Sequence, residues 1–256
     1  MTGQKIISII TPSFNQGAYI ERTIRSVLQQ EVNFPFEYII VDGGSTDETP
    51  GILKKYSERI QWISEKDRGQ SDALNKGISM AKGGIIGYLN SDDIYLQGTL
   101  QKVADQFALN PETKWLYGMA GMINDQDAEI RKWISWYKKI SSRAFNYRRL
   151  LRENYISQPA VFFKKQAFDL VGGFDPGLHY AMDYDLWLRL ARVNHPLVIK
   201  DDLAAFRMHE QSKSSLNFKN LFTEQYQVHQ RYDQNQWLLF KHRLTIRLIQ
   251  TIYRLL

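Results

Sequence analysis

The chain has 256 residues, a length typical of one domain with a substantial core. Its 43% hydrophobic and 23% charged residues are those of a globular protein and argue against a disordered or fibrous chain. The absence of cysteine excludes disulfides, thiolate metal sites and cysteine nucleophiles, while the net charge of +6 is compatible with nucleic acid, an anionic membrane or a phosphorylated substrate.

The first ninety or so residues alternate short β-rich runs with helical patterns. Strands are predicted at IISIIT, FEYIIVD, IQWIS and GIIGYLN, and helices at GAYIERTIRSVLQQ, up to Tyr56, and at QSDALNKGISMA. This alternation predicts a parallel sheet with right-handed crossovers. Ligands of such sheets bind beyond the carboxyl ends of the strands, which makes the polar residues there site candidates. These residues are Thr11, Asp42, Asp67, Asp92 and Asp93.

Beyond Leu96 the alternation is less regular. A helix is predicted to about Leu109, then mixed segments at KWLYGMAGMI and AVFFKK, then a helix from about Asp183 to Val193. We expect this half to continue the same sheet. After Ser215 the pattern is helical to the end, without Pro or Gly. The predicted organisation is one domain over residues 1–215 and a helical tail over residues 216–256.

The segment YLNSDD ends an apolar strand with two adjacent carboxylates, Asp92 and Asp93. Like charges this close repel, and each raises the pKa of the other unless a cation intervenes. Magnesium or manganese, held by oxygen ligands, would remove this repulsion and leave coordination positions for a diphosphate. One of the two acids could instead cap the helix that begins near Leu96. The segment alone leaves both interpretations open.

The segment IIVDGGSTDETPGIL places Asp42 at a strand end before a glycine turn. Gly43 and Gly44 would let a planar or charged ligand approach the backbone. The segment lacks the Lys-Ser/Thr ending of a phosphate-binding loop and the three spaced glycines of a dinucleotide fingerprint. Taken alone, the segment is better explained by an ordinary tight turn than by a ligand site.

Six segments in order resemble the family-two glycosyltransferases of the GT-A fold, from about Ile6 to Ser215. They are TPSFNQGAYIERTIRSVLQQ, YIIVDGGSTDET, EKDRGQSDALNKGI, GYLNSDD, GGFDPGLHYAMDYDLWLRLA and FRMHEQSKS. The resemblance implies an α/β fold with a Rossmann-like, mostly parallel sheet flanked by helices. It also implies a metal-dependent, inverting transfer of a sugar from a nucleotide-sugar to an acceptor hydroxyl. Residues 1–95 would then bind the donor and residues 96–215 the acceptor.

The resemblance also implies roles for single residues. The nucleotide-sugar donor would bind the residues that match the family's early motifs: Thr11, Pro12, Asp42, Arg68 and Asp92.

The remaining roles fall on the second half of the chain. The cation, manganese or magnesium, would bind Asp93 as the direct ligand and His209 as a further one, although a histidine in a polar loop is usually only solvated. The segment AMDYDLWLRLA resembles the catalytic motif and makes Asp183 the general base, with a helix N-cap as the alternative role. Asp185 is assigned a structural role, and Gln158 is the acceptor-site candidate. Near His209, two cations are candidates to neutralise the diphosphate, Arg207 and Lys213.

Two departures from the family pattern concern specificity. Gly43 stands where many relatives have a second Asp that contacts the base of uridine nucleotides. UDP-, GDP- and dTDP-sugars therefore all stay open as donors. Met182 stands where the family has a Glu before the catalytic Asp, which removes one hydrogen-bonding group from the acceptor site.

Two basic segments lie outside these motifs. Residues 131–152 contain eight Lys or Arg side chains, no acid and several aromatic residues, a composition found in single-strand-binding surfaces, at membrane interfaces and on ordinary solvated surfaces. The tail WLLFKHRLTIRLIQTIYRLL predicts an amphipathic helix with a narrow polar stripe. We expect it to lie on an anionic membrane, with packing on protein as the alternative. The stripe consists of Arg243, Arg247, Gln250 and Arg254.

The sequence thus predicts a glycosyltransferase of surface-polysaccharide biosynthesis that acts on a glycan or lipid-linked acceptor. No apolar segment of about 20 residues is present, so we expect a cytoplasmic protein, peripheral at the inner face of the cell membrane. A sugar-phosphate nucleotidyltransferase is the rival enzyme, but PSFNQGAY lacks the basic, glycine-rich loop expected after its first strand. A nucleic-acid partner is not expected, because acids at successive strand ends would repel phosphate.

Overall fold

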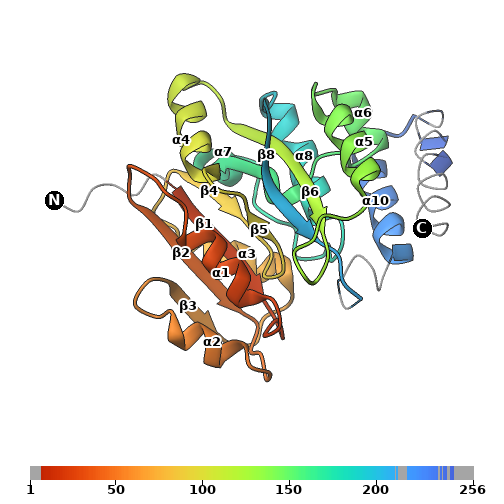
Figure 1. Ribbon diagram of the computed structural model, residues 1–256. Coiled ribbons are helices and arrows are strands. Elements are labelled where there is room, and N and C mark those ends of the chain that lie inside the picture. The colour runs from red at the N-terminus through yellow and green to blue at the C-terminus, as the bar shows by residue number, and fades with distance from the viewer. Residues whose placement is uncertain are drawn as a thin grey trace.

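The computed structural model describes residues 7–210, 212, 218–235, 237, 239, 240, 243 and 244 (Figure 1). The strands are β1 (Ile7–Ser13), β2 (Phe36–Asp42), β3 (Gln61–Ser64), β4 (Ile85–Tyr88), β5 (Ile94–Tyr95), β6 (Trp115–Ile123), β7 (Val161–Lys164) and β8 (Leu197–Arg207). The helices are α1 (Ile20–Leu28), α2 (Thr49–Lys55), α3 (Gln70–Met80), α4 (Thr99–Leu109), α5 (Lys132–Ser142), α6 (Tyr147–Arg152), η1 (Gln158–Ala160), α7 (Lys165–Leu170), α8 (Met182–Val193) and α10 (Phe218–Tyr232).

The eight strands of the described residues form one sheet, in the order β3-β2-β1-β4-β7-β6-β8-β5. The pairs β1–β2, β1–β4, β2–β3 and β6–β8 are parallel, whereas β7 and β5 pair with their neighbours in the antiparallel direction. Strands from both halves of the chain therefore share one sheet. The predicted α/β fold with a mostly parallel sheet is confirmed.

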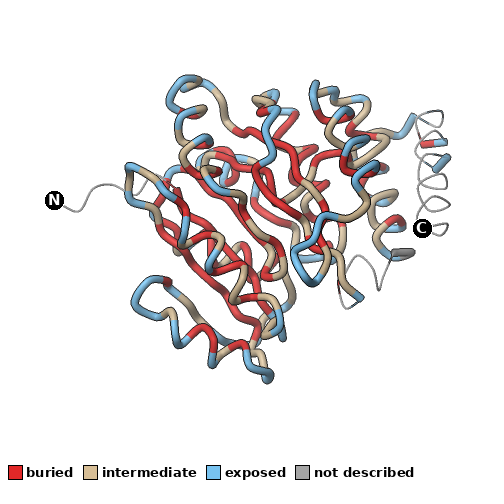
Figure 2. The backbone as a smooth tube through the Cα atoms, in the orientation of Figure 1, coloured by how far each residue is buried: buried red, intermediate tan, exposed pale blue. Residues whose placement is uncertain are grey.

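The strands at the centre of the sheet are buried and mostly apolar because helices cover both faces. In β2, Tyr38 and Ile40 belong to one core cluster, and Ile39 and Val41 belong to the other. Helices α1, α2 and α4 pack on the first face, and α3, α6, α7, α8 and α10 contribute to the core on the second. Figure 2 shows the buried strands running between partly exposed helices.

Helix α10 follows the six family-like segments and packs on α8. The Tyr232 hydroxyl donates to Asp185 Oδ1 at 2.7 Å, and Arg189 on α8 itself donates to Asp185 Oδ2 at 2.9 Å. Asp185 is 2% exposed. This carboxylate therefore joins two helices, a geometry in keeping with the structural role predicted for it.

No helix in the described part of the chain is long and apolar enough to cross a membrane. Most of the predicted amphipathic tail, including Arg247, Gln250 and Arg254, lies outside the described residues, as does Lys213.

Candidate active site

A pocket of about 250 Å³ opens beside the turn that follows β4, and its walls come from β6, α5, η1, α8 and α10. Three predicted site residues line it: Asp92, Gln158 and Asp183. Two polar side chains that the motifs did not identify also line it, Lys138 and Asn154. The pocket thus brings together carboxylates that lie some ninety residues apart in the sequence.

Asp183 is the second residue of α8, at the end of the helix where backbone N–H groups have no carbonyl partner within the helix. Its Oδ1 accepts from the Tyr184 N–H at 2.7 Å, and its Oδ2 accepts weakly from the Asn154 amide at 3.4 Å. Burial raises the pKa of the Asp183 carboxyl to about 6, although these hydrogen bonds oppose the rise. A carboxylate with a pKa near neutrality is suited to accept a proton during a reaction.

Glu224, on α10, fixes the backbone just before Asp183. Its Oε1 accepts from the His179 N–H at 2.9 Å, and its Oε2 accepts from the N–H groups of Tyr180 and Ala181, both at 2.5 Å. One carboxylate thus satisfies three successive backbone donors at the entrance of α8. A charged acceptor makes these bonds stronger than bonds between neutral groups, so Glu224 anchors the segment that carries Asp183.

Replacing Glu224 by Ala is expected to lower the free energy of unfolding by about 1–3 kcal/mol, because two partly buried N–H groups and one exposed N–H group lose their acceptor. Glu224→Gln should cost less, since the amide oxygen still accepts. Urea denaturation followed by circular dichroism measures both, with exposed Glu58→Ala as the control. Equal stability of Glu224→Ala and Glu58→Ala would contradict the anchoring role.

The adjacent acids Asp92 and Asp93 have different surroundings. Asp93 is fully buried, its Oδ1 accepts from the Arg207 N–H at 2.8 Å, and its Oδ2 accepts from the Asn90 amide at 3.3 Å. Burial, and then the charge of Asp92, raise the pKa of the Asp93 carboxyl well above its usual range. Asp92 instead lines the pocket, and its Oδ2 lies 3.1 Å from Nε2 of His209.

A divalent cation would fit between Asp92 and His209. Adjacent ligands of an octahedral ion, at bond lengths of about 2.1 Å, lie about 3 Å apart, close to the separation of these two atoms. The His209 ring is held against Tyr19, with ring centroids 4.2 Å apart. Among the described residues, no group of three or more His, Asp or Glu could hold a metal. A cation here would therefore complete its shell with oxygen atoms of a bound ligand.

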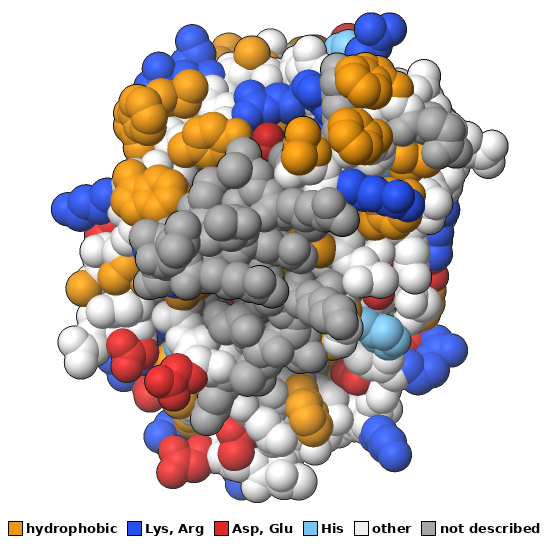
Figure 3. All heavy atoms as spheres, turned by 90° about the vertical axis from the view of Figure 1, so that its right-hand side faces the viewer, with side chains coloured by type: hydrophobic (Ala, Val, Ile, Leu, Met, Phe, Trp, Pro, Cys, Tyr) orange, Lys and Arg blue, Asp and Glu red, His pale blue; other side chains and the backbone are white. Residues whose placement is uncertain are grey.

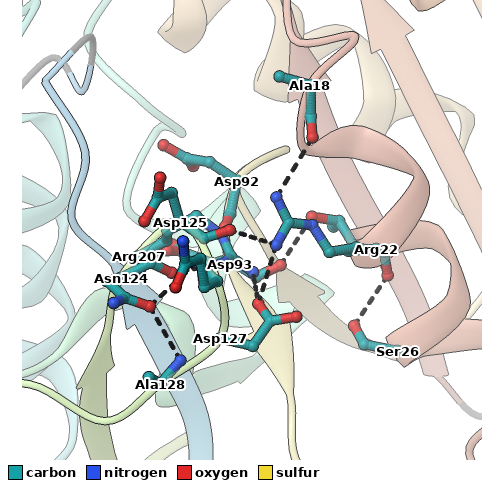
Figure 4. Close-up of polar contacts among 12 residues, drawn as sticks. Ala18, Arg22, Ser26, Asp92, Asp93, Asn124, Asp125, Asp127, Ala128 and Arg207 are labelled. Carbon is teal, nitrogen blue, oxygen red and sulfur yellow. Dashed lines mark hydrogen bonds and ion pairs between the residues drawn. The ribbon is translucent and has the colours of Figure 1, made fainter.

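Arg207 holds the turn that carries both acids (Figure 4). Its buried guanidinium donates through Nε to the Asp92 carbonyl at 2.7 Å and through Nη1 to the Asn124 carbonyl at 2.5 Å. Nη2 forms an ion pair with Asp127 at 2.5 Å, and Arg22 on α1 contacts the same carboxylate at 3.4 Å. The Arg207 side chain is 0% exposed, and its guanidinium is already held by these contacts. This structural role therefore competes with the predicted role of Arg207 in neutralising a diphosphate.

Of the predicted donor residues, Thr11 and Pro12 are buried in β1, and Thr11 Oγ1 lies 3.0 Å from the Tyr38 hydroxyl. Arg68 lies outside the sheet, with 76% of its side chain exposed, and pairs with Asp72 one turn later at 2.7 Å. None of the three lines the described pocket.

Asp42 organises the turn after β2. It accepts from the Ser45 N–H at 2.9 Å, from the Ser45 hydroxyl at 2.5 Å and from the Ser64 hydroxyl at 2.6 Å. A Cβ atom at Gly43 would lie 2.8 Å from Oδ2 of Asp67. A side chain at position 43 would therefore require the carboxylate of Asp67 to move.

Asn90 connects the acid turn to the pocket, and the motifs do not single it out. Its Nδ2 donates to Gln158 Oε1 at 3.0 Å, and its Oδ1 accepts from Gln70 at 2.7 Å. Gln158 also donates to the Tyr88 carbonyl at 2.8 Å. A polar side chain directly before Ser-Asp-Asp at a strand end is the available signal for Asn90. Nothing local indicates Glu224, which acts across about forty residues.

The chain is similar in sequence to a known protein family and to known proteins. The model for glycosyl transferase family 2 matches residues 8–170. The chain is 31% identical over 206 residues to an uncharacterized protein of Mycobacterium tuberculosis, MT1568, with 72% of this chain and 61% of that one covered. It is 30% identical over 191 residues to a chondroitin synthase of Escherichia coli, with 73% and 27% covered. The chain thus spans less than two thirds of either relative.

Solved structures share the fold. The mannosyltransferase PcManGT of Pyrobaculum calidifontis, in complex with GDP-Man and Mn²⁺, has a TM-score of 0.68 at 16% identity, with 95% of this chain and 74% of that one covered. S. aureus TarS 1-349, in complex with UDP-GlcNAc, has a TM-score of 0.67 at 19% identity, with 87% and 65% covered. Both are similar to this chain in the GT-A arrangement of strands and helices. The match to the family model covers well over half of the chain, and the chain therefore belongs to glycosyl transferase family 2.

Proposed function

We propose that the protein transfers a sugar, with inversion, from a nucleotide-sugar to an acceptor hydroxyl in the synthesis of a surface polysaccharide. The observation that carries the proposal is Asp183, whose carboxylate has a pKa of about 6 and lines one pocket with Asp92. The family match and the chondroitin synthase relative support glycosyl transfer over the rival nucleotidyl transfer.

Asp183 is the general base in this proposal. Its ionised Oδ2 takes the proton of the acceptor hydroxyl while that oxygen attacks the anomeric carbon, and the nucleoside diphosphate leaves from the opposite side. A single displacement inverts the anomeric centre and requires no second carboxylate as nucleophile. Asn154 and the Tyr184 N–H hold the carboxylate in place for this step.

Asp92 and His209 are the proposed ligands of the divalent cation, manganese or magnesium. The sequence predicts Asp93 as the ligand, but its two oxygens already accept from Arg207 and Asn90 inside the protein, which favours Asp92. A cation here would act as a Lewis acid on the diphosphate of the donor. Asp93 and Arg207 would then position the turn, without direct contact with the cation.

The donor is proposed to be a UDP-, GDP- or dTDP-sugar, and the similar structures with UDP-GlcNAc and GDP-Man support this class. A thermal-shift panel of UDP, GDP and dTDP, with and without Mn²⁺, tests it. One nucleotide should raise the melting temperature in the presence of Mn²⁺, by the equivalent of about 2.7 kcal/mol at a hundred times its Kd. No shift with any of the three, or equal shifts without the cation, would contradict the proposal.

The acceptor is proposed to be a glycan or a lipid-linked precursor, and the enzyme to work in the cytoplasm at the inner face of the cell membrane. Gln158, the predicted acceptor residue, lines the pocket while its amide is held by Asn90 and the Tyr88 carbonyl. The amphipathic tail is a proposed second contact with an anionic membrane.

A further inference from the structure

Helix α5 turns an apolar face outward. Trp133, Trp136, Tyr137 and Ile140 are 49%, 65%, 48% and 45% exposed. Their spacing of three, one and three residues places them on one stripe about 100° wide, because successive helix residues are about 100° apart. The opposite side of the helix is buried and includes Ile134. We call the four exposed side chains the α5 aromatic face.

The segment that contains this face, residues 131–152, is rich in basic side chains and lacks acidic ones. Residues 131–152 contain eight Lys or Arg and no Asp or Glu. Lys132 and Lys139 are paired with acids outside the segment, at 3.5 and 2.7 Å. Arg143 and Arg148 are exposed and form no ion pair with any described residue. Figure 3 shows hydrophobic side chains gathered beside Lys and Arg on the side of the molecule that carries α5, α6 and α10.

We propose that the α5 aromatic face docks on the headgroup region of an anionic lipid bilayer. Trp and Tyr are the residues enriched at that depth, where an apolar ring body and a polar edge are both satisfied. Arg143, directly after α5, and Arg148, on the neighbouring segment α6, are exposed cations that match the negative surface of such a bilayer. The rings and an aliphatic side chain form a continuous stripe, the arrangement of helices that lie in the interface plane.

Two other binding partners fit the α5 aromatic face less well than a bilayer does. Single-stranded nucleic acid would use the rings for stacking, but Ile140 in the same stripe offers no stacking surface. A second copy of the chain, related by a twofold axis, would bring two strongly basic segments together, and their like charges would repel.

The inner side of α5 contributes to the pocket, so docking through α5 is connected with the proposed reaction. This step rests on the proposed function. Lys138 projects from the side of α5 away from the aromatic face and lines the pocket with Asn154 and Asp183. The same short helix therefore separates the pocket from the proposed membrane surface. Docking through α5 would bring the pocket beside the bilayer, where a lipid-linked acceptor presents its hydroxyl group.

Sedimentation of the full chain with vesicles tests the proposal, using phosphatidylcholine alone and phosphatidylcholine with phosphatidylglycerol. We expect binding to the anionic vesicles that weakens with added salt. The variant Trp133→Ser/Trp136→Ser should reduce the partition coefficient at least tenfold, and Arg143→Glu/Arg148→Glu should do the same. Leu109→Ser, at a leucine 73% exposed on α4, and Lys54→Glu/Lys82→Glu, at exposed lysines on the body of the protein, are the matched controls and should bind like the wild type.

Equal partitioning of the tryptophan variant and the wild type would overturn the proposal, and would leave the tail as the membrane contact if binding persists. Displacement of the vesicles by a single-stranded oligonucleotide, with the same dependence on Trp133 and Trp136, would also overturn it. Nucleotide-dependent thermal shifts, measured without vesicles, should be unchanged in the tryptophan variant. A chain that binds vesicles through α5 but shows no such shift would refute the proposed function and leave the docking surface standing.

Discussion

Asp183→Asn is expected to slow sugar transfer by about two to four orders of magnitude while nucleotide binding is retained. That range is the usual contribution of a positioned general base. The amide cannot take the proton of the acceptor hydroxyl, but its oxygen still accepts from the Tyr184 N–H. Initial rates of nucleoside diphosphate release in the presence of acceptor measure the first effect, and calorimetry with the nucleotide measures the second.

The same residue predicts how the rate depends on pH. The base acts only when ionised, so kcat/KM of the wild type should fall as the pH is lowered through about 6. In Asp183→Asn, the residual rate should lose this dependence. A wild-type profile that stays flat from pH 5 to pH 8 would mean that another group takes the proton.

Raising the pH through about 6 should lower the free energy of unfolding, although it raises the activity. The pKa of Asp183 is raised from 3.8 to about 6 on folding, so its ionised form costs stability above pH 6, and the cost disappears below pH 3.8. At 1.36 kcal/mol per pKa unit, the cost is at most about 3 kcal/mol. Asp183→Asn should therefore resist urea better than the wild type at pH 7.5, which separates lost catalysis from lost folding.

Asp185→Asn is the matched control on the same helix turn. Its carboxylate binds Tyr232 and Arg189 and does not line the described pocket, so this variant should lose stability and keep most of its activity. Near wild-type turnover by Asp183→Asn, together with an inactive but folded Asp185→Asn, would transfer the role of base to Asp185.

Asp92→Asn is expected to lower Mn²⁺-dependent nucleotide affinity by about a hundredfold or more. Removing residues that merely support a metal ligand costs about 10- to 100-fold, and a neutral amide in place of the ligand itself should cost at least as much. His209→Gln should give a loss in the same direction. Calorimetric titration of the nucleotide, with and without Mn²⁺, measures both.

Asp93→Asn distinguishes the two adjacent acids. If Asp93 positions the turn, its Asn variant should keep Mn²⁺-dependent binding within about tenfold of the wild type, because the amide oxygen still accepts from the Arg207 N–H. The opposite ranking, with binding lost in Asp93→Asn and kept in Asp92→Asn, would restore the assignment made from the sequence alone.

Local sequence patterns are sufficient to predict the elements and the family. Apolar runs such as IISIIT and FEYIIVD predict buried parallel strands, and β1 and β2 are found there in parallel register. Each such pattern depends on residues a few positions apart, because helices and strands repeat every 3.6 and 2 residues. The family resemblance likewise rests on short contiguous segments, and it indicates Asp183 and Asp92 as site residues, which the fold brings to one pocket.

What each polar side chain faces depends instead on the tertiary structure. Asp92 and Asp93 are equivalent in the sequence, but the turn after β4 directs one toward His209 and the other toward the backbone of Arg207. Glu224 reaches the entrance of α8 only because α10 packs there, and Asp67 fills the space beside Gly43 only because β3 lies next to β2. These contacts join segments distant in the chain, and no local period encodes them. Whether a carboxylate binds a ligand or holds the backbone therefore depends on packing, which a single sequence does not display.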